Sequence, residues 1–352
     1  MKPTDTASPK LFIGIDIHKR SWQIFTATDL FQGKGLTVPP EPSVLKKYVD
    51  QNFKGYQVYT AYEAGCCGYS AHRVFESYGW HSIVFNPADL SRTGKMMYQK
   101  TDGLDAQLIC RELKDGRLRC ITIPDIDREQ LRSLFRRRND LVKKLRTIKT
   151  RLKANLLYLG IKVPDNYDNS NWSKAFLEWI RDLCFEYPTA EAALESRLNE
   201  YDFILNELRY ISNELRAWCR RHHKKDYYLL RSIPGIGPIV ACGIISELGD
   251  IRRFDNLKQL AGYIGLMPGI KQSGEGKPRS RGISPRGHNL MRSYFVEATW
   301  QALRRDPVMQ NYYRTHRGKD TKAILIKVAR KLLSRTLAVM RTEIPYQAGV
   351  EA

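Results

Sequence analysis

The feature that most constrains the fold is residues 11–16, an apolar run that ends on a single carboxylate, Asp16. Apolar runs with β-branched residues predict a buried strand. In open sheets, ligands bind in the crevice at the carboxyl ends of the strands. Asp16 is therefore expected where chemistry can occur, although an aspartate at the end of a strand is more often a turn residue or a helix cap.

The next hundred residues alternate between strand and helix patterns, which predicts an α/β domain over residues 1–125. We expect helices over residues 43–53, from the glycine turn after Glu63 to Tyr78, and from about Thr101 onwards. The expected strands are residues 11–16, 22–28, 33–38, 56–62 and 81–85.

Four acids stand out in this domain: Asp16 ends the first strand, Glu63 ends a central strand, and Asp102 and Asp105 share one face of a later helix. Clustered carboxylates raise each other's pKa unless cations lie among them. Such oxygen ligands suit Mg²⁺ or Mn²⁺, and two ions about 4 Å apart can hold both reacting oxygens of a phosphodiester. Two alternatives stay open, because Asp102 could cap a helix and Glu63 could pair with a lysine.

The charge balance points to a polyanionic partner. The 58 Lys and Arg residues against 37 Asp and Glu residues give a net charge of +21, spread along the chain. This distribution favours nucleic acid over a membrane surface. Seven cysteines without a C-x-x-C pair fit neither a disulfide framework nor a zinc site, which favours a reducing cytoplasm. Neither a signal region nor an apolar run long enough to span a membrane is expected.

Residues 126–225 are predicted to form a helical coiled-coil spacer or dimerisation arm. Eleven Lys and Arg residues lie between Arg128 and Lys153, with leucines at a three-to-four spacing. A second, more acidic amphipathic helix follows over about residues 191–220. The pair favours an antiparallel hairpin or an exchange of helices between protomers. Arg136, Arg137 and Lys143 are candidate nucleic-acid contacts, whereas a plain spacer is the alternative.

Residues 226–352 are predicted to form a mostly α domain. The turn Pro234-Gly235-Ile236-Gly237 before an apolar helix (residues 239–248) is similar to a helix-hairpin-helix element. Gly235 and Gly237 would let backbone N–H groups approach a phosphate. An ordinary tight turn is the alternative.

A polar loop of Gly, Ser, Lys and Arg comes next, before a helix over residues 288–303; a last amphipathic helix covers residues 321–340. A serine that attacks a phosphodiester needs exposure, activation and nearby positive charge. Ser273, Ser280 and Ser284 are the candidates, and a loop serine is usually inert. The cations that could supply charge are Lys271, Lys277, Arg279, Arg281 and Arg286.

The acid motifs also carry a family resemblance. An Asp at the end of one strand, a Glu at the end of another and an Asp-x-x-Asp motif on a later helix resemble the arrangement of acids in the RNase H fold of Holliday-junction resolvases. The stretches 14–16, 63–65 and 100–106 are closer still to insertion-sequence transposases with an Asp-Glu-Asp-Asp tetrad, a family that includes pilin-gene-inverting and bridge-RNA-guided recombinases. The turn Gly65-Cys66-Cys67-Gly68 departs from the threonine-glycine form of many members. The order Gly-Leu-x-Pro, Ser-Gly, Ser-x-x-Gly in residues 265–287 resembles the family's second catalytic domain.

This resemblance implies a RuvC-like RNase H-fold domain with the metal held by Asp16, Glu63, Asp102 and Asp105, and a nucleophilic serine at Ser273. It implies a DNA transposase or site-specific recombinase that depends on Mg²⁺ or Mn²⁺, works as a homodimer or tetramer, and uses a structured guide RNA. Two alternatives differ in class. One is a resolvase-like nuclease that uses water as nucleophile, and the other is a non-catalytic nucleic-acid-binding scaffold.

Overall fold

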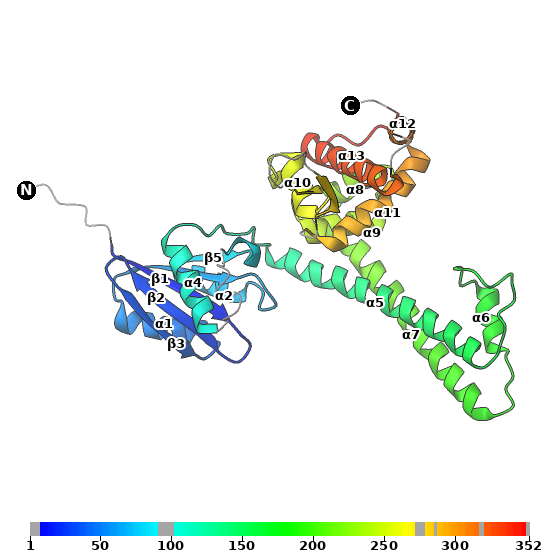
Figure 1. Ribbon diagram of the computed structural model, residues 1–352, viewed down its shortest axis with the longest axis horizontal. Coiled ribbons are helices and arrows are strands. Elements are labelled where there is room, and N and C mark those ends of the chain that lie inside the picture. Colours follow the sequence, from blue (N-terminus) through cyan, green and yellow to red (C-terminus); the bar gives the residue numbers. More distant parts are fainter. Residues whose placement is uncertain (1–7, 91–101, 272–278, 285–286, 317–319, 350–352) are drawn as a thin grey trace, which may run out of the picture. The chain divides into compact units, whose positions relative to one another are not determined.

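The computed structural model describes residues 8–90, 102–271, 279–284, 287–316 and 320–349, and it divides into two compact units, Met1–Ile123 and Pro124–Ala352 (Figure 1). None of the described helices is both long enough and apolar enough to cross a membrane.

The first unit is built on a five-stranded sheet in the order β3-β2-β1-β4-β5. Strands β1, β2 and β3 pair antiparallel, whereas β4 pairs parallel with β1 and β5 pairs parallel with β4. All five predicted strands are present. Their bounds are β1 (Lys10–Ile17), β2 (Trp22–Thr28), β3 (Gln32–Val38), β4 (Gln57–Glu63) and β5 (His81–Phe85).

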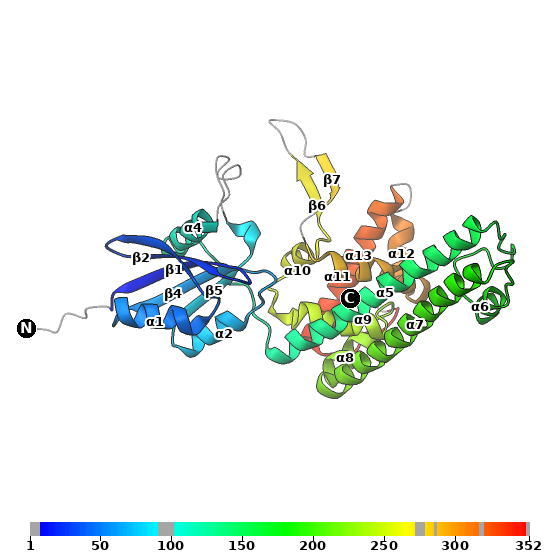
Figure 2. The ribbon, with the colours of Figure 1, turned by 90° about the horizontal axis from the view of Figure 1, so that it is seen from below.

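Helices cover both faces of this sheet (Figure 2). Helices α1 (Pro42–Asn52) and α2 (Ser70–Ser77) lie on one face, where Ile13 and Ile15 are buried with Leu45 and Phe75. Helix α4 (Asp102–Lys114) covers the other face, on which Phe12, Ala61 and Phe85 pack with Leu108 and Ile109. A short 3₁₀ turn, η1 (Pro87–Asp89), follows β5. The double-sided burial explains why β1 is a continuous apolar run.

A helical hairpin opens the second unit. Helix α5 (Ile126–Tyr158) packs along α7 (Pro188–His222), and a connection that contains α6 (Lys174–Arg181) joins them (Figure 1). Asp125 caps α5 by accepting a 2.8 Å hydrogen bond from the Arg128 backbone N–H. The two helices bury the leucines whose spacing predicted them, among them Leu141, Leu152 and Leu198. Of the two predicted arrangements, the described chain forms the hairpin.

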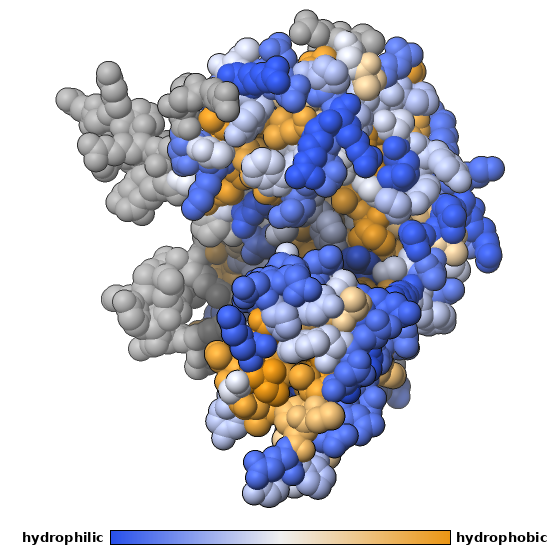
Figure 3. All heavy atoms as spheres, turned by 90° about the vertical axis from the view of Figure 1, so that its right-hand side faces the viewer, coloured by the Kyte–Doolittle hydropathy of each residue, from blue (hydrophilic) through white to orange (hydrophobic). Residues whose placement is uncertain are grey.

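A groove lies near the tip of this hairpin, where Leu183 and Phe185 are half-buried. Ile180, Leu183, Phe185 and Leu194 help to line this groove of about 250 Å³ between α6 and α7. Figure 3 faces this end of the unit and shows apolar residues gathered in its lower part among hydrophilic ones.

The rest of the second unit is a helical body around one core, which includes Phe135 of α5, Leu215 of α7, Phe295 and Leu333. Its elements are α8 (Lys224–Ser232), α9 (Pro238–Gly243), the π-helical segment η2 (Ile244–Leu248), the 3₁₀ turn η3 (Ile251–Arg253), α10 (Leu257–Ile264), β6 (Pro268–Lys271), β7 (Arg279–Ile283), α11 (Asn289–Arg305), α12 (Pro307–Thr315) and α13 (Thr321–Thr342). The start of α5 and the end of α7 therefore belong to the core of the body, whereas the rest of the hairpin has a core of its own.

Three features of this unit differ from the sequence predictions. The helix expected over residues 239–248 changes to π-helix at Ile244. The polar loop before residue 288 contains the antiparallel pair β6–β7. Helices α6, α8, α10 and α12 were not predicted, because eight or nine residues give too few turns for a periodic pattern and tertiary packing decides their formation.

Candidate catalytic and nucleic-acid-binding sites

Two of the predicted acids end neighbouring parallel strands. Ile15 of β1 lies opposite Tyr62 of β4, and Asp16 and Glu63 are the next residues on their strands. Side chains alternate between the two faces of a strand. Ile15 and Tyr62 belong to the core beneath α1 and α2, so Asp16 and Glu63 point to the face that α4 covers. Both acids are half-buried.

Helix α4 brings the other two acids to the same edge. Its Cys110 thiol donates to the Phe12 carbonyl at 3.3 Å, and its Lys114 ammonium donates to the Thr28 carbonyl at 2.7 Å. Thr28 pairs with Leu11 at the start of β1. The helix therefore runs opposite to β1, and its first turn, which contains Asp102 and Asp105, lies toward the end of the strand that carries Asp16.

Glycine in β1 permits this approach. A Cβ atom on Gly14 would lie 2.3 Å from the backbone nitrogen of Cys110, closer than such atoms can come. The α4 backbone therefore rests directly on β1, two residues before Asp16. The side chain of Asp102 lies outside the described residues, whereas Asp105 is half-buried.

His18 and Cys67 accompany the acids and were not predicted as site residues. His18 Nε2 lies 3.1 Å from Asp16 Oδ2, and the Cys67 thiol donates to the Ile17 carbonyl at 3.6 Å. Burial, followed by the neighbouring Cys66 and Asp16, raises the pKa of the Cys67 thiol. The signal for His18 was in the sequence, because side chains two residues apart at a strand end point to one face.

The donor set at this edge is made of carboxylates, which are the ligands that Mg²⁺ and Mn²⁺ prefer, and in this respect the residues fit the predicted metal. Among the side chains that the structure describes, no group of three or more His, Cys, Asp or Glu residues is placed to hold a metal ion. The Asp102 side chain is not among the described side chains.

The predicted serine loop is described in part. Ser273, Lys277 and Arg286 lie outside the described residues. Lys271 ends β6 and is paired with Arg279 of β7, which also carries Ser280 and Arg281. The Ser284 N–H donates to the Met267 carbonyl at 3.1 Å and closes the base of the hairpin. The strands on either side of the predicted Ser273, β6 and β7, are therefore paired with each other (Figure 2).

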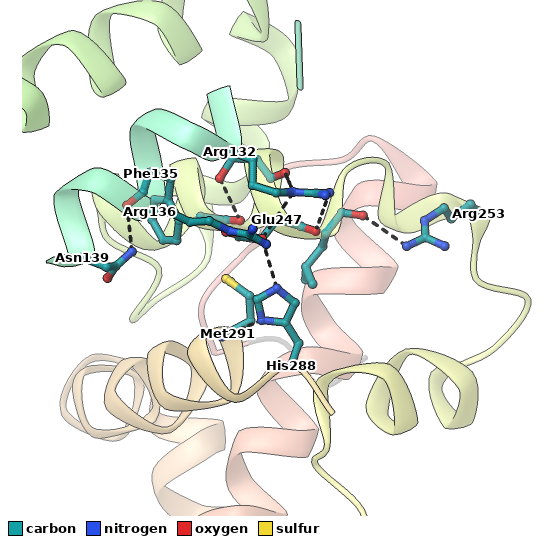
Figure 4. Close-up of polar contacts among 11 residues, drawn as sticks. Arg132, Phe135, Arg136, Asn139, Glu247, Arg253, His288 and Met291 are labelled. Carbon is teal, nitrogen blue, oxygen red and sulfur yellow. Dashed lines mark hydrogen bonds and ion pairs between the residues drawn. The ribbon is translucent and has the colours of Figure 1, made fainter. Parts of the chain in front are cut away.

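A buried carboxylate that the sequence did not reveal lies at the junction of the hairpin and the helical body. The side chain of Glu247 in η2 is 0% exposed, and three cationic or imidazole groups surround it (Figure 4). Arg136 donates through Nε and Nη2 at 2.8 and 3.0 Å, while Arg132 Nε lies 3.4 Å from Oε2. His288 Nε2 is 3.1 Å from Oε2. Glu247 thus links α5 to the residue just before α11.

The contacts of His288 define its tautomer. Its Nδ1 accepts a 3.3 Å hydrogen bond from the Met291 N–H and so caps α11, which leaves Nε2 to carry the proton that is donated to Glu247. Burial by itself would raise the pKa of Glu247, but the hydrogen bonds from His288 and Arg136 outweigh it and lower that pKa. The cluster therefore holds an ionised, fully paired carboxylate.

The remaining predicted nucleic-acid contacts fall into two sets. Arg137 and Lys143 lie exposed on α5, and Arg136 remains 58% exposed although it pairs with Glu247. Gly235 and Gly237 lie in the turn that leads into α9.

Comparisons with known proteins extend over both units. A model of the transposase IS116/IS110/IS902 family matches residues 227–314, and a model of the DEDD transposase domain of the IS110 type matches residues 13–159. The y4qE transposase-family protein of Sinorhizobium fredii is 30% identical over 294 residues, which are 82% of this chain and 71% of that protein. The chain belongs to the IS110/IS116 transposase family.

Two further relatives show the range of the family. The transposase for insertion sequence element IS1111A of Coxiella burnetii is 25% identical over 68% of this chain, which spans 64% of that protein. The pilin gene-inverting protein of Moraxella bovis is 35% identical over 125 residues, 35% of this chain and 39% of that protein. The family resemblance predicted from the acid motifs is thereby confirmed, and DNA rearrangement is the function that the family supports.

Proposed function

We propose that this transposase-family protein cuts and rejoins DNA strands with Mg²⁺, using Asp16, Glu63, Asp102 and Asp105 to hold the metal and Ser273 as the nucleophile. The observation that carries the proposal is the parallel pairing of β1 and β4, which end on Asp16 and Glu63, beneath the acid-bearing first turn of α4. The order of the sheet and its covering helices support the assignment of an RNase H-like domain.

The side chains of the proposed site have different roles in cleavage. When bound, Mg²⁺ supplies positive charge that stabilises the transition state of phosphodiester cleavage. His18, at 3.1 Å from Asp16, restrains that carboxylate. The Ser273 hydroxyl loses its proton and bonds to phosphorus, while the bond from phosphorus to one deoxyribose oxygen breaks and that oxygen takes up a proton and leaves as a hydroxyl. The broken phosphodiester is kept as a phosphoserine, so the reverse attack by a DNA hydroxyl rejoins strands without a high-energy cofactor.

The proposal includes a structured guide RNA and a homo-oligomer, which the family resemblance implies. The net charge of +21 supports a large nucleic-acid partner. RNA that copurifies with the protein, and whose removal by ribonuclease abolishes cleavage at a chosen target, is the expected result. Cleavage that survives complete removal of RNA would contradict the proposal that the protein needs a guide RNA.

Neutralising the acids tests the proposed function. Asp16→Asn, Glu63→Gln and Asp105→Asn should each lower strand cleavage at least a hundredfold, because several kcal/mol of transition-state stabilisation are removed, roughly 1.4 kcal/mol for each factor of ten. Affinity for DNA should stay close to that of the wild type. Asp50→Asn, an exposed acid on α1 that pairs with Lys46, is the matched control and should cleave normally. Full cleavage by Asp16→Asn in Mg²⁺ would exclude the assignment.

A further inference from the structure

Two adjacent cysteines lie in the turn that follows β4. Cys66 and Cys67 are the middle residues of this turn, which the Gly68 N–H closes by donating to the Gly65 carbonyl at 3.4 Å. They are the only cysteines in the sequence that are next to each other. The threonine-glycine form of the turn in many family members carries no thiol, and the proposed cleavage chemistry uses neither cysteine.

The two thiols are placed to react with each other. Their Sγ atoms lie 4.0 Å apart, and closing a disulfide brings such atoms to about 2 Å. Cys66 is exposed, whereas Cys67 is half-buried. An oxidant in solution therefore meets Cys66 first, and Cys67 is the neighbour that can attack the oxidised sulfur. Redox-sensing cysteines have this combination of an accessible thiol and a second thiol beside it.

Cys67 also connects the pair to the edge of the sheet that carries the acids. Its thiol donates to the carbonyl of Ile17, the residue after Asp16 on β1, at 3.6 Å. The turn begins two residues after Glu63, the last residue of β4. The Tyr62 hydroxyl donates to the last carbonyl of the turn at 3.2 Å. A change in the turn is therefore passed to both strand ends that carry an acid.

A bond between neighbouring cysteines suits a switch better than a permanent cross-link. Neighbouring Cα atoms are about 3.8 Å apart across a trans peptide, less than the roughly 4.4–6.8 Å that is usual for a disulfide. Disulfides outside the usual geometry are more easily reduced. The bond would also close too short a loop to stabilise the fold through chain entropy.

We propose that Cys66 and Cys67 form a reversible redox switch, in which a hydroperoxide oxidises them to a disulfide that lowers strand cleavage. One peroxide oxygen is transferred to the Cys66 sulfur as a sulfenic acid, and the other leaves as water or an alcohol. The Cys67 sulfur then bonds to the Cys66 sulfur, and the displaced hydroxyl leaves as water with the proton of the Cys67 thiol. The two sulfurs lose one electron each, and the peroxide takes up both. A thiol reductant reverses the change.

The disulfide acts through the contact with Ile17. Closing the Sγ–Sγ distance from 4.0 Å draws Cys67 away from the Ile17 carbonyl, next to Asp16, and pulls on the turn after Glu63. A displacement of about 1 Å in a reacting group can lower a rate about a hundredfold. We therefore expect oxidation to lower cleavage at least tenfold. This effect rests on the proposed function, whereas formation of the disulfide does not.

Mass spectrometry tests the bond in the full-length protein. The tryptic peptide of residues 55–73 contains both thiols and no other cysteine. After hydrogen peroxide and then an alkylating reagent, this peptide should be two hydrogen atoms lighter than the reduced form and carry no alkyl group. Dithiothreitol should restore two thiols that can be alkylated. Two alkylated thiols after peroxide, or a disulfide that joins two chains, would overturn the proposal.

Cleavage by wild type, Cys66→Ser and Cys120→Ser tests the switch. Cys66→Ser cannot form the bond but keeps Cys67 beside Ile17, and Cys120→Ser removes another exposed thiol of the first unit as the matched control. All three should cleave alike in reductant. Peroxide should inhibit wild type and Cys120→Ser, reversibly with dithiothreitol, and spare Cys66→Ser. Equal inhibition of Cys66→Ser would place the oxidation elsewhere, and full cleavage by wild type that carries the disulfide would overturn the switch.

The affinity for Mn²⁺, followed by electron paramagnetic resonance, separates this proposal from the proposed function. Oxidation should weaken Mn²⁺ binding severalfold in wild type and leave it unchanged in Cys66→Ser. If reduced wild type binds Mn²⁺ without cleaving DNA, the proposed function is wrong, and the change in affinity on oxidation still supports the switch. Equal affinities of the reduced and the disulfide form would contradict the connection to the acids.

Discussion

A Cβ atom on Gly14 would lie 2.2 Å from the carbonyl oxygen of Ala106, so β1 and α4 meet backbone to backbone. This contact lies between two parts of the acid cluster, because Asp16 follows Gly14 on the strand and Asp105 precedes Ala106 on the helix. A glycine without catalytic chemistry therefore sets how near the carboxylates of α4 come to those of the sheet.

Replacing Gly14 by alanine should separate α4 from β1. The added methyl group meets backbone atoms that cannot rotate away, so we expect a decrease of about 1–3 kcal/mol in the free energy of unfolding, together with the loss of most of the strand-cleavage activity. Gly35→Ala in β3 is the matched control. Its Cβ would make only ordinary contacts, 3.7 Å from Phe25 and 3.8 Å from the Ile24 carbonyl oxygen. Urea unfolding and DNA cleavage measure both effects, and a Gly14→Ala protein as stable as the control would contradict the close contact.

Glu247→Gln should destabilise the second unit by roughly 3 kcal/mol at neutral pH, since it leaves Arg136 and Arg132 beside an uncharged group in a buried site. The pKa of Glu247 is lowered in the folded chain. Its ionisation therefore adds stability that is complete above the ordinary glutamate pKa of about 4.3 and is lost as the pH falls through the lowered value.

The difference between wild type and Glu247→Gln should consequently be constant from pH 5 to 7 and shrink below about pH 4. Denaturant unfolding at several pH values measures it. Glu297→Gln, an exposed acid of α11, serves as control and should change stability by less than about 0.5 kcal/mol. A difference between wild type and Glu247→Gln that grows toward acid pH would mean that the buried carboxyl is neutral.

The exposed cations of α5 should contact nucleic acid. Reversing Arg137, Lys143 and Lys144 together should flatten the salt dependence of DNA binding, by roughly 0.9 for each phosphate that the variant no longer neutralises. Arg138 offers a contrast, because its guanidinium donates to Ser212 and Tyr294 inside the unit. Arg138→Glu should lower stability. An unchanged slope for the triple variant would assign this face of α5 to protein–protein packing.

Ser273→Ala should bind DNA and fail to cut it, whereas wild-type protein should leave a denaturant-resistant protein–DNA adduct at Ser273. Ser280→Ala and Ser284→Ala are the controls and should retain cleavage. Mixing Ser273→Ala with Asp102→Asn protein should restore part of the activity if the acids of one protomer work with the serine of another. Absence of an adduct would exclude Ser273 as the nucleophile. Absence of complementation would mean that the acids and the serine of one chain form the whole site.

Local sequence pattern was enough for much of the fold. The strand run before Asp16, the strand before Glu63 and the leucine spacing of α5 and α7 each follow from contacts between residues a few positions apart. Short helices such as α10 were not predicted, since packing rather than periodicity stabilises them. The family resemblance came from local motifs of the same kind, namely the acids that end two strands and begin a helix, together with their nearest neighbours in the sequence.

By itself, the sequence determined which residues could carry chemistry: the acids that follow strands, the basic helix and the glycine turn. Only the tertiary structure decided which of them meet. Glu247 shows the reason, because its partner Arg136 lies 111 residues away and nothing in either neighbourhood marks the pair. Likewise, Gly14 is an ordinary strand residue in the sequence until α4 is placed on it. Gly235 and Gly237 look alike in the sequence, although their φ angles are +94° and −72°. Burial and close approach are properties of neighbours brought together by folding, and a linear pattern does not contain them.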